Sequence, residues 1–313
     1  MSVKVFIDGS SGTTGLRIAD RLAARPEIEL LHISEEGRKD VNERARVINS
    51  ADLAFLCLPD AASKEVMPLV KPEVKILDTS TAFRTDVAWD YGFPELRGQK
   101  EKIQKSHRVA VPGCYASGFI SIARPLVELG LVPVEYPFSC TGISGYSGGG
   151  KKMIAEYESA DRPAHSKLDA PKSYGLGLAH KHLPEMKEIS GLAHTPAFVP
   201  VVCDYYSGMQ VLVPLDLKLA GTTAEAVAAG ITDYYQGGAT VTVHALNEPL
   251  PENGLYSNAM AGTDRMELYM TVNAAGDQMM LVSLFDNLGK GSSGAALQCM
   301  NLMLGLPETE GLE

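Results

Sequence analysis

Cys114 is the residue of this chain best placed for nucleophilic chemistry. It follows a strand-like stretch at 108–111 and a Pro112-Gly113 turn, and a long helical pattern begins directly after it. At the N-terminus of a helix, unpaired backbone N–H groups and the helix dipole favour the thiolate form of a cysteine. We therefore expect Cys114 to be a nucleophile. The alternative is an inert buried thiol, which is what we expect of Cys57.

Two histidines and a carboxylate stand close together further along the chain. His180, His182 and Glu185 belong to the run His-Lys-His-Leu-Pro-Glu. An imidazole near the thiol can move protons between the sulfur, the leaving group and the developing alkoxide, so one histidine is the predicted acid/base residue. The spacing leaves open which one, because positions i and i+2 point apart on a helix. A charged helix start is one alternative; a metal site is another, but no third ligand has suitable spacing.

A glycine-rich loop follows the first predicted strand. Its glycines depart from the common Gly-x-Gly-x-x-Gly spacing, yet they come after a strand and open a helix, as in a dinucleotide-binding loop. Glycine lets backbone amides approach a pyrophosphate closely, and the helix N-terminus favours its charge. The predicted cofactor contacts are the loop's glycines and hydroxyl residues: Gly9, Ser10, Ser11, Gly12, Thr13, Thr14 and Gly15. A glycine-rich turn without a ligand is the alternative.

The residues after the second predicted strand bear on the choice between NAD and NADP. An acidic residue at the strand end binds the ribose hydroxyl of NAD, whereas basic residues accommodate the 2′-phosphate of NADP. Ser34 stands at the strand end, and Arg38 and Lys39 follow it, although Glu35 and Glu36 lie between them. The balance predicts NADP(H), with Ser34 and Arg38 as its contacts.

Other segments carry groups that suit an anionic substrate. Ser80 and Arg84 follow a predicted strand, and the carboxyl ends of parallel strands face the ligand crevice. Arg84 can hold a phosphate or carboxylate bidentately, and its alternative is a surface ion pair with Asp86 or Asp90.

Two polar loops complete the candidate contacts. Ser144 and Gly145 open a Gly-, Ser- and Lys-rich loop whose amides and hydroxyls can receive substrate; a flexible solvated loop is the alternative. Asn287 and Lys290 precede the last predicted helix, where we expect a second cofactor contact.

We also expect Glu185, the carboxylate of the histidine-containing run, to contact substrate.

Strand and helix patterns alternate in the first third of the chain. One helical stretch should bury Leu16, Ala19, Leu22 and Ala23 on a single face. Strands separated by helices predict an α/β fold with a Rossmann-like, doubly wound parallel sheet. Its predicted strands are 3–7, 28–33, 53–58, 74–78 and 108–111.

The pattern changes after the first long helix. Further strands suggest a mixed or antiparallel sheet, at 138–141, 197–202, 209–219, 239–246, 268–272 and 279–285. We expect an NADP-binding domain at 1–115, completed by a C-terminal helix within 286–313. A catalytic and oligomerisation domain of the α+β class is expected at 116–285.

Composition limits the possible partners. The 313 residues carry a formal net charge of -10, which argues against nucleic acid or an anionic membrane as partner. No signal-peptide pattern occurs, and no apolar run approaches the ~20 residues that span a bilayer. The five cysteines are scattered and odd in number, which favours reduced thiols and a cytoplasmic protein.

Several motifs together resemble the N-acetyl-γ-glutamyl-phosphate reductase family, in its shorter second type. They are the segments 8–15, 78–84, 111–115, 180–185 and 286–291, and they occur in family order over nearly the whole chain. The cysteine and histidine motifs are specific in combination, whereas the glycine loop alone is not. More distantly the chain is similar to aspartate-semialdehyde dehydrogenase.

This resemblance implies NADPH-dependent reduction of N-acetyl-L-glutamyl 5-phosphate to the 5-semialdehyde with release of inorganic phosphate, a step of arginine biosynthesis. It implies Cys114 as the nucleophile, either His180 or His182 as the acid/base residue with His180 favoured, and a homodimer or homotetramer. The alternatives are a related reductase of another acyl phosphate, a cysteine-dependent acyl hydrolase and an NADP-sensing binding protein.

Overall fold

The computed structural model describes residues 2–313, which divide into two compact units. Unit 1 comprises Met1–Pro94, Gly98–Pro112 and Ser292–Leu312, and unit 2 comprises Glu95–Arg97, Gly113–Gly291 and Glu313. The chain therefore leaves unit 1 directly before Gly113 and returns to it at Ser292.

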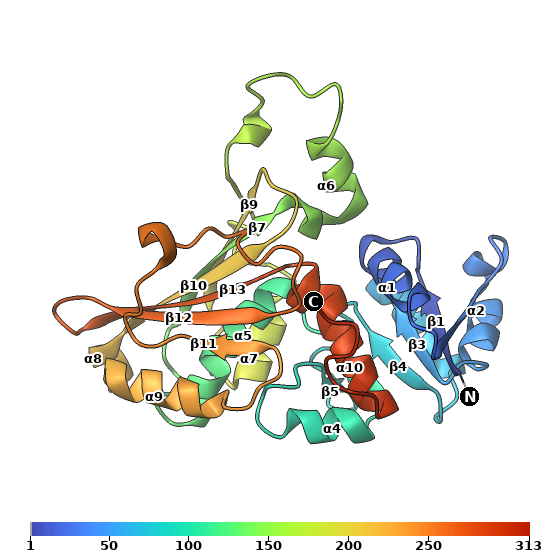
Figure 1. Ribbon diagram of the computed structural model, residues 1–313, viewed down its shortest axis with the longest axis horizontal. Coiled ribbons are helices and arrows are strands. Elements are labelled where there is room, and N and C mark those ends of the chain that lie inside the picture. Colours follow the sequence, from blue (N-terminus) through green and yellow to red (C-terminus); the bar gives the residue numbers. More distant parts are fainter. Residues whose placement is uncertain (1) are drawn as a thin grey trace. The chain divides into compact units, whose positions relative to one another are not determined.

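Unit 1 is built on a six-stranded sheet in which every pair of neighbouring strands is parallel. The strand order is β2-β1-β3-β4-β6-β5, so the chain winds outward in both directions from β1 and β3 (Figure 1). This order confirms the predicted Rossmann-like sheet. Its strands are β1 (Val3–Asp8), β2 (Ile28–Leu31), β3 (Leu53–Leu56), β4 (Lys75–Asp78), β5 (Asp90–Tyr91) and β6 (Arg108–Ala110).

Helices cover both faces of this sheet. One core packs side chains of β1, β3 and β4 against α1 (Thr13–Ala23), α4 (Gln99–Lys105) and α10 (Gly294–Leu304). The other core includes α2 (Val41–Ile48) and α3 (Asp60–Val66). The short 3₁₀ turns η1 (Gly37–Lys39) and η2 (Met67–Leu69) complete the unit. All four residues of β3 are buried and apolar, as expected for a central strand with helices on both faces of its sheet.

The predicted buried face of α1 was wrong in part. Of the predicted residues, Leu22 is fully buried and Ala19 is partly buried, but Leu16 is 48% exposed and Ala23 is exposed too. Because Leu16 stands one residue after Gly15, it lies beside the glycine-rich loop rather than in the core. It is therefore available to a ligand of that loop.

Unit 2 contains a seven-stranded mixed sheet of order β11-β12-β13-β10-β7-β9-β8. The pairs β7–β9 and β11–β12 are parallel and the other pairs are antiparallel, which confirms the predicted mixed sheet. Its strands are β7 (Ser139–Gly145), β8 (Lys172–Ser173), β9 (Ala197–Cys203), β10 (Met209–Asp216), β11 (Val241–Val243), β12 (Met266–Val272) and β13 (Gln278–Phe285).

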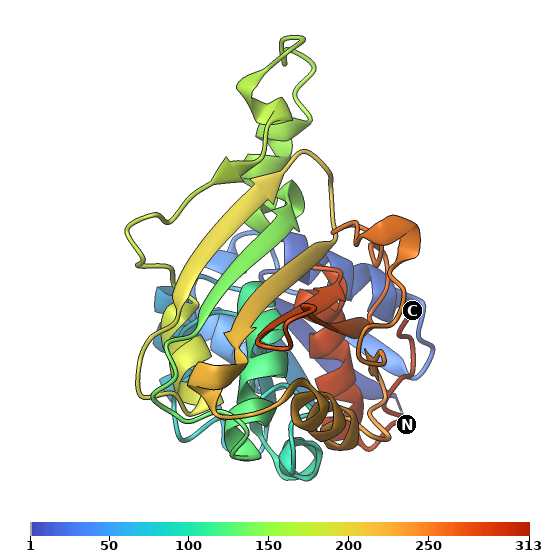
Figure 2. The ribbon, with the colours of Figure 1, turned by 90° about the vertical axis from the view of Figure 1, so that its left-hand side faces the viewer.

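Helix α5 (Cys114–Glu128) lies against this sheet at a glycine. A Cβ on Gly118 would stand 2.5 Å from a methyl carbon of Val211 and 2.7 Å from the hydroxyl of Ser283, so only glycine allows this approach. The other helices are α6 (Gly150–Tyr157), α7 (Leu183–Ser190), α8 (Leu217–Ala220) and α9 (Ala224–Tyr234), with short turns η3 (Tyr146–Gly149), η4 (Lys167–Asp169) and η5 (Pro251–Asn253). Figure 2 shows α6 and the chain up to β8 standing away from the sheet.

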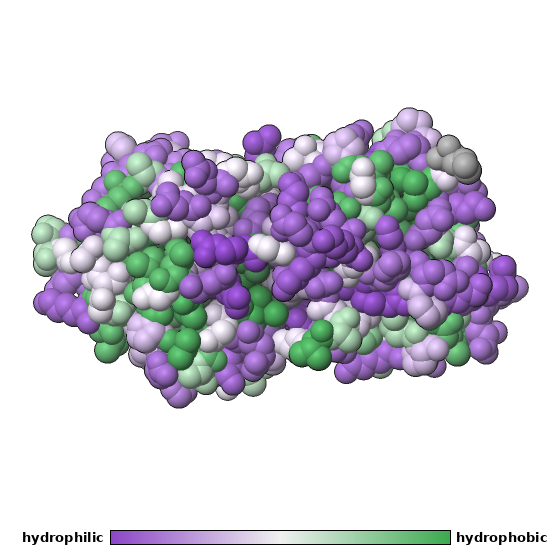
Figure 3. Space-filling view, turned by 90° about the horizontal axis from the view of Figure 1, so that it is seen from below, coloured by the Kyte–Doolittle hydropathy of each residue, from purple (hydrophilic) through white to green (hydrophobic). Residues whose placement is uncertain are grey.

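The opposite face of the unit 2 sheet carries its own apolar cluster. Tyr269, Val282 and Leu284 are buried there, and Leu212 and Met280 are partly buried beside them. On the face that Figure 3 shows, hydrophobic residues form separate patches between hydrophilic ones. Within residues 2–313, no helix is both long and apolar enough to cross a bilayer.

Candidate active site

Cys114 is the first residue of α5. Gly113 precedes it in an extended conformation (φ -78°, ψ 144°) as the N-cap, so the half-buried thiol lies at the end of the helix where the first N–H groups have no partner within the helix. This is the position predicted from the Pro-Gly turn. The N–H of Gly113 donates a hydrogen bond of 2.9 Å to the carboxylate of Glu185.

Glu185 is 2% exposed and lies in the first turn of α7. Its carboxylate holds the backbone directly before Cys114. The expected contact of Glu185 with substrate stays a prediction beside this hydrogen bond with Gly113.

Both histidines of the His-x-His pair lie near Tyr115, the residue after Cys114. The ring centroids of His180 and Tyr115 are 5.7 Å apart, and those of His182 and Tyr115 are 6.1 Å apart. The two imidazoles are 4.7 Å from each other. The predicted divergence of i and i+2 does not apply here, because α7 begins only at Leu183 and His182 is its N-cap.

His180 is half-buried and neutral in this environment. Burial, and then the charge of Lys181, lower the pKa of His180 to about 4. Its Nδ1 accepts a hydrogen bond of 3.2 Å from the N–H of His182, so we assign the ring proton to Nε2. Nε2–H is then a hydrogen-bond donor. His182 is buried, with 5% of its surface exposed.

A second tyrosine, Tyr174, joins the cluster and was not predicted. Its hydroxyl lies 3.3 Å from that of Tyr115, and its ring meets the ring of His180 edge-on. Burial raises the pKa of Tyr174; the hydrogen bond with Tyr115 lowers it, and negative charge on Cys114 raises it. Tyr174 belongs to a loop without periodicity, so the sequence offered no signal for it.

The two polar loops of unit 2 are held by internal hydrogen bonds. Ser144 is 2% exposed, and its hydroxyl donates to the carbonyl of Gly145 over 3.1 Å. The amide of Asn287 accepts from the N–H of Gly208 and donates to the hydroxyl of Ser147.

Lys290 takes part in a buried ion pair. Its Nζ lies 2.7 and 2.9 Å from the two carboxylate oxygens of Glu95, and both side chains are 2% exposed. The side chains of Asn287 and Lys290 thus bond to segments of unit 2 that are far apart in the sequence.

In unit 1, the predicted anion contacts of the β4 loop lie near the strand end. Ser80 donates from its N–H and its hydroxyl to the carboxylate of Asp78, at 2.9 and 2.6 Å. Arg84 is 7% exposed and donates to the carbonyls of Val111 (2.9 Å) and Thr79 (3.0 Å). These backbone contacts join the loop after β4 to the end of the stretch that leads to the Pro-Gly turn.

The glycine-rich loop has the tight geometry that close approach to a ligand requires. Gly9 has φ +87°, and a Cβ there would stand 2.3 Å from the carbonyl oxygen of Cys57. A Cβ on Gly15 would stand 2.4 Å from the carbonyl oxygen of Gly9. Helix α1 begins at Thr13 with Gly12 as its N-cap, so its unpaired N–H groups open onto this loop.

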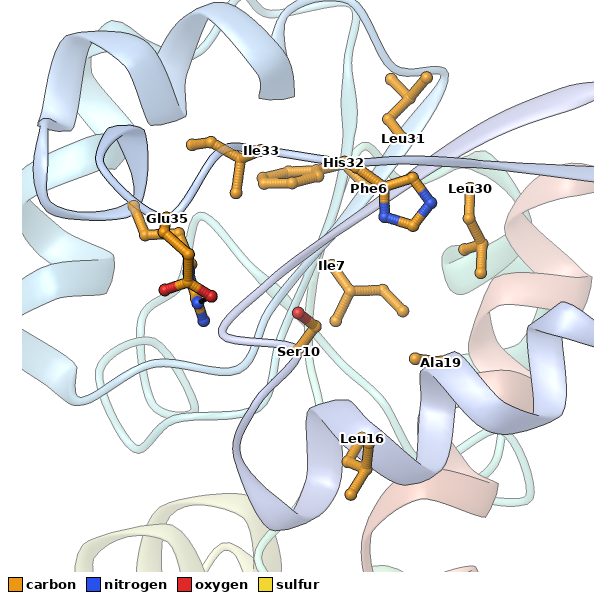
Figure 4. A pocket seen from close by; sticks show the side chains of 11 residues that line it. Phe6, Ile7, Ser10, Leu16, Ala19, Leu30, Leu31, His32, Ile33 and Glu35 are labelled. Carbon is orange, nitrogen blue, oxygen red and sulfur yellow. Dashed lines mark ion pairs between the residues drawn. The ribbon is translucent and has the colours of Figure 1, made fainter.

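A cavity of about 290 Å³ lies beside this loop (Figure 4). Ser10 and Leu16 line it from the loop and α1, and His32 and Glu35 line it from the segment after β2. Arg38 also lines the cavity and forms an ion pair with Glu35. Ser34 accepts a hydrogen bond from Gly37 within the same turn.

The other residues of the loop vary in exposure. Thr14 lies 3.1 Å from the hydroxyl of Ser292, Ser11 is exposed and Thr13 is half-buried. A nicotinamide dinucleotide fits these features: glycine backbone that allows close approach, the N-terminus of α1, and a cavity lined by the cationic side chain of Arg38. No group of three or more metal-ligating side chains occurs in the part of the chain that the structure describes.

Comparison with family models identifies both units. A model described as the semialdehyde dehydrogenase NAD binding domain matches residues 4–106, and one described as the semialdehyde dehydrogenase dimerisation domain matches residues 114–287. The first match shows that unit 1 contains a nicotinamide-nucleotide-binding domain.

Solved structures share the fold at low sequence identity. Aspartate semialdehyde dehydrogenase II from Vibrio cholerae, complexed with ASA, gives a TM-score of 0.67 at 15% identity and covers 97% of this chain and 99% of its own. The enzyme from Francisella tularensis gives a TM-score of 0.69 at 14% identity, with coverage of 96% and 100%.

Curated relatives are much closer in sequence. N-acetyl-gamma-glutamyl-phosphate reductase of Trichormus variabilis is 46% identical, with 99% of both chains covered. The reductases of Burkholderia cenocepacia (44% identical, 96% of this chain and 97% of the relative) and Rhizobium etli (46%, 97% and 99%) are similar. At this identity over nearly the full length, the chain belongs to the N-acetyl-gamma-glutamyl-phosphate reductases of the semialdehyde dehydrogenase family.

Proposed function

We propose that this chain reduces N-acetyl-L-glutamyl 5-phosphate to N-acetyl-L-glutamate 5-semialdehyde, with NADPH as the hydride donor and release of inorganic phosphate. The reaction is a step of arginine biosynthesis. One observation carries the proposal: a half-buried cysteine begins α5, with two imidazoles packed against the next residue. The names of the relatives supply the substrate.

The thiolate of Cys114 attacks the acyl carbon of the substrate. A C–S bond forms, the bond from carbon to the phosphate oxygen breaks with its electron pair, and a thioester remains on the protein. The bound nicotinamide nucleotide supplies the hydride that reduces this thioester. The oxyanion then re-forms the carbonyl group and expels Sγ, which releases the aldehyde and regenerates the thiolate. The thiolate is regenerated, but the departing phosphate takes up one proton at neutral pH, so the complete reaction consumes one proton.

The neutral ring of His180 suits the oxyanion stage. With its proton on Nε2, the imidazole donates a hydrogen bond to the developing negative oxygen, and the N–H groups of the first turn of α5 add further donors. A neutral histidine as electrophilic donor has precedent in enzymes that lower its pKa. We therefore propose that His180 stabilises the oxyanion. The backbone N–H of His182 holds the ring of His180 through its hydrogen bond to Nδ1.

We propose NADP(H) as the cofactor on the basis of Arg38 and Ser34. The guanidinium of Arg38 lines the cavity beside the glycine loop, where a ribose 2′-phosphate can compete with Glu35 for it. The acyl phosphate needs its own cationic or amide contacts. Ser80, Arg84, Ser144 and Gly145 remain the candidates for this role.

We further propose that the chain forms a homodimer or homotetramer through unit 2. The matching family model is described as a dimerisation domain, and one sheet face of unit 2 carries the apolar cluster around Tyr269 and Met280. A second copy would cover the partly buried side chains at the edge of this cluster, such as Leu212 and Met280.

Replacement of the nucleophile tests the central step. Cys114→Ser should lower kcat by roughly 10³-fold or more, because an alkoxide is not available at neutral pH, while NADPH binding measured by calorimetry stays unchanged. Cys203→Ser, at another half-buried cysteine of the same unit, should retain activity. Normal turnover by Cys114→Ser would refute covalent catalysis at this residue.

The histidine role makes a prediction about pH. His180→Ala should lower kcat about 10²–10³-fold, the usual loss for an oxyanion donor, whereas exposed His194→Ala should have no effect. Because burial holds the pKa of His180 near 4, the wild-type profile of kcat/KM should show no inflection near the ordinary value of about 6.5. An inflection there that vanishes in His180→Ala would contradict this role.

Cofactor preference should depend on Arg38. Arg38→Ala should raise KM for NADPH by about 10-fold or more through loss of a charged hydrogen bond, and leave KM for NADH nearly unchanged. Arg46→Ala is the matched control, since Arg46 pairs with Glu43 and does not line the cavity. Equal losses with both nucleotides would argue against a 2′-phosphate contact.

Light scattering of the purified chain tests the assembly. The expected mass is two or four times 33.5 kDa. Met280→Glu, which places a charge in the apolar cluster, should reduce the mass, while Leu219→Glu, at an exposed position of α8, should not. A wild-type monomer at micromolar concentration would contradict the proposal.

A further inference from the structure

Gly291 lies directly against the side chain of Cys114. A Cβ built on Gly291 would stand 2.9 Å from the Cβ of Cys114, 3.1 Å from the carbonyl oxygen of Asp286 and 3.2 Å from a ring carbon of Phe285. Carbon atoms at 2.9 Å overlap, so any side chain at position 291 would displace Cys114 or its neighbours.

Space, and not backbone conformation, demands glycine at this position. Gly291 is not among the glycines with positive φ, so an L-residue could adopt its backbone angles. Gly305 presents the opposite case: it has φ +70° and no atom within 4 Å of a built Cβ. The requirement at position 291 therefore comes from its contacts.

The backbone that carries Gly291 is firmly anchored. It belongs to the π-helix η6 (Gly289–Ser293), and the N–H of Gly291 donates to the carbonyl of Asp286 over 2.9 Å. The carboxylate of Asp286, fully buried, accepts from the N–H groups of Gly262 (2.7 Å) and Leu288 (2.9 Å). Gly289 is equally confined, since a Cβ there would stand 2.0 Å from the carbonyl oxygen of Thr263.

Two side chains of the segment 286–291 also anchor it to other parts of unit 2. The amide of Asn287 bonds to Gly208 and Ser147, and Lys290 forms the buried ion pair with Glu95. The segment 286–291 is thus a rigid surface whose point of contact with Cys114 is a glycine. Irregular π-turns of this kind are frequent at functional sites.

We propose that Gly291 is a positioning residue for the nucleophile. The Cβ of Cys114 rests on the backbone at Gly291, and this contact fixes the direction in which Sγ leaves the first turn of α5. The proposal depends on the proposed function, in which Sγ must approach an acyl carbon at the distance and angle that addition to a carbonyl group requires. A displacement of about 1 Å at a reacting atom can cost about 10²-fold in rate.

Gly291→Ala tests this contact, with Gly254→Ala as the matched control because Gly254 has extended φ and no atom within 4 Å of a built Cβ. We expect kcat to fall about 10- to 100-fold, with KM for NADPH and for the acyl phosphate within about threefold of wild type. The pH profile of Cys114 alkylation by iodoacetamide should also shift, which a purely structural role would not cause. Unchanged kcat and alkylation, even with a lowered Tm, would overturn the proposal.

A double-mutant cycle keeps the test decisive if Gly291→Ala is unstable. Cys114→Gly removes the Cβ that the new methyl group would strike, so Gly291→Ala should lower Tm by at least roughly 2 °C less in that background than in wild type. Equal losses in both backgrounds would overturn the proposal. Failure of the proposed function can be distinguished from failure of this positioning role, because only the former would appear as normal turnover by Cys114→Ser.

Discussion

A hydrogen bond from the N–H of Gly113 to the buried carboxylate of Glu185 ties together the parts of the catalytic site in unit 2. It holds the turn that delivers Cys114 to α5, and its acceptor lies in the same short segment as His180 and His182. A charged acceptor makes such a bond worth about 1.5–3 kcal/mol. The relative placement of thiol and imidazoles therefore depends on this contact.

The chemistry that follows needs little from the protein beyond placement and charge. A thiolate at a helix N-terminus can attack an activated acyl phosphate, and the same thiolate is regenerated when the aldehyde leaves. Burial lowers the pKa of His180 to about 4, which suits the proposed role of a neutral hydrogen-bond donor. Gly291 confines the nucleophile from behind, and the glycine-rich loop of unit 1 provides the backbone cradle for a dinucleotide.

The sequence predicted those features that depend on local pattern. Alternating strands and helices led to the parallel sheet, and the Pro-Gly turn placed Cys114 at a helix start. The sequence could not predict contacts between residues far apart in the chain. Examples are the ion pair of Lys290 with Glu95 and the hydrogen bond from Arg84 to the carbonyl of Val111. Tyr174 was missed for the same reason, since only folding brings its irregular loop to Tyr115.

Mass spectrometry of protein quenched during turnover tests the account most directly. With N-acetyl-L-glutamyl 5-phosphate and no NADPH, the account predicts an N-acetylglutamyl adduct on the peptide that contains Cys114, and its disappearance once NADPH is added. Steady reduction of the substrate with no adduct at this cysteine, or with an adduct at another residue, would contradict it.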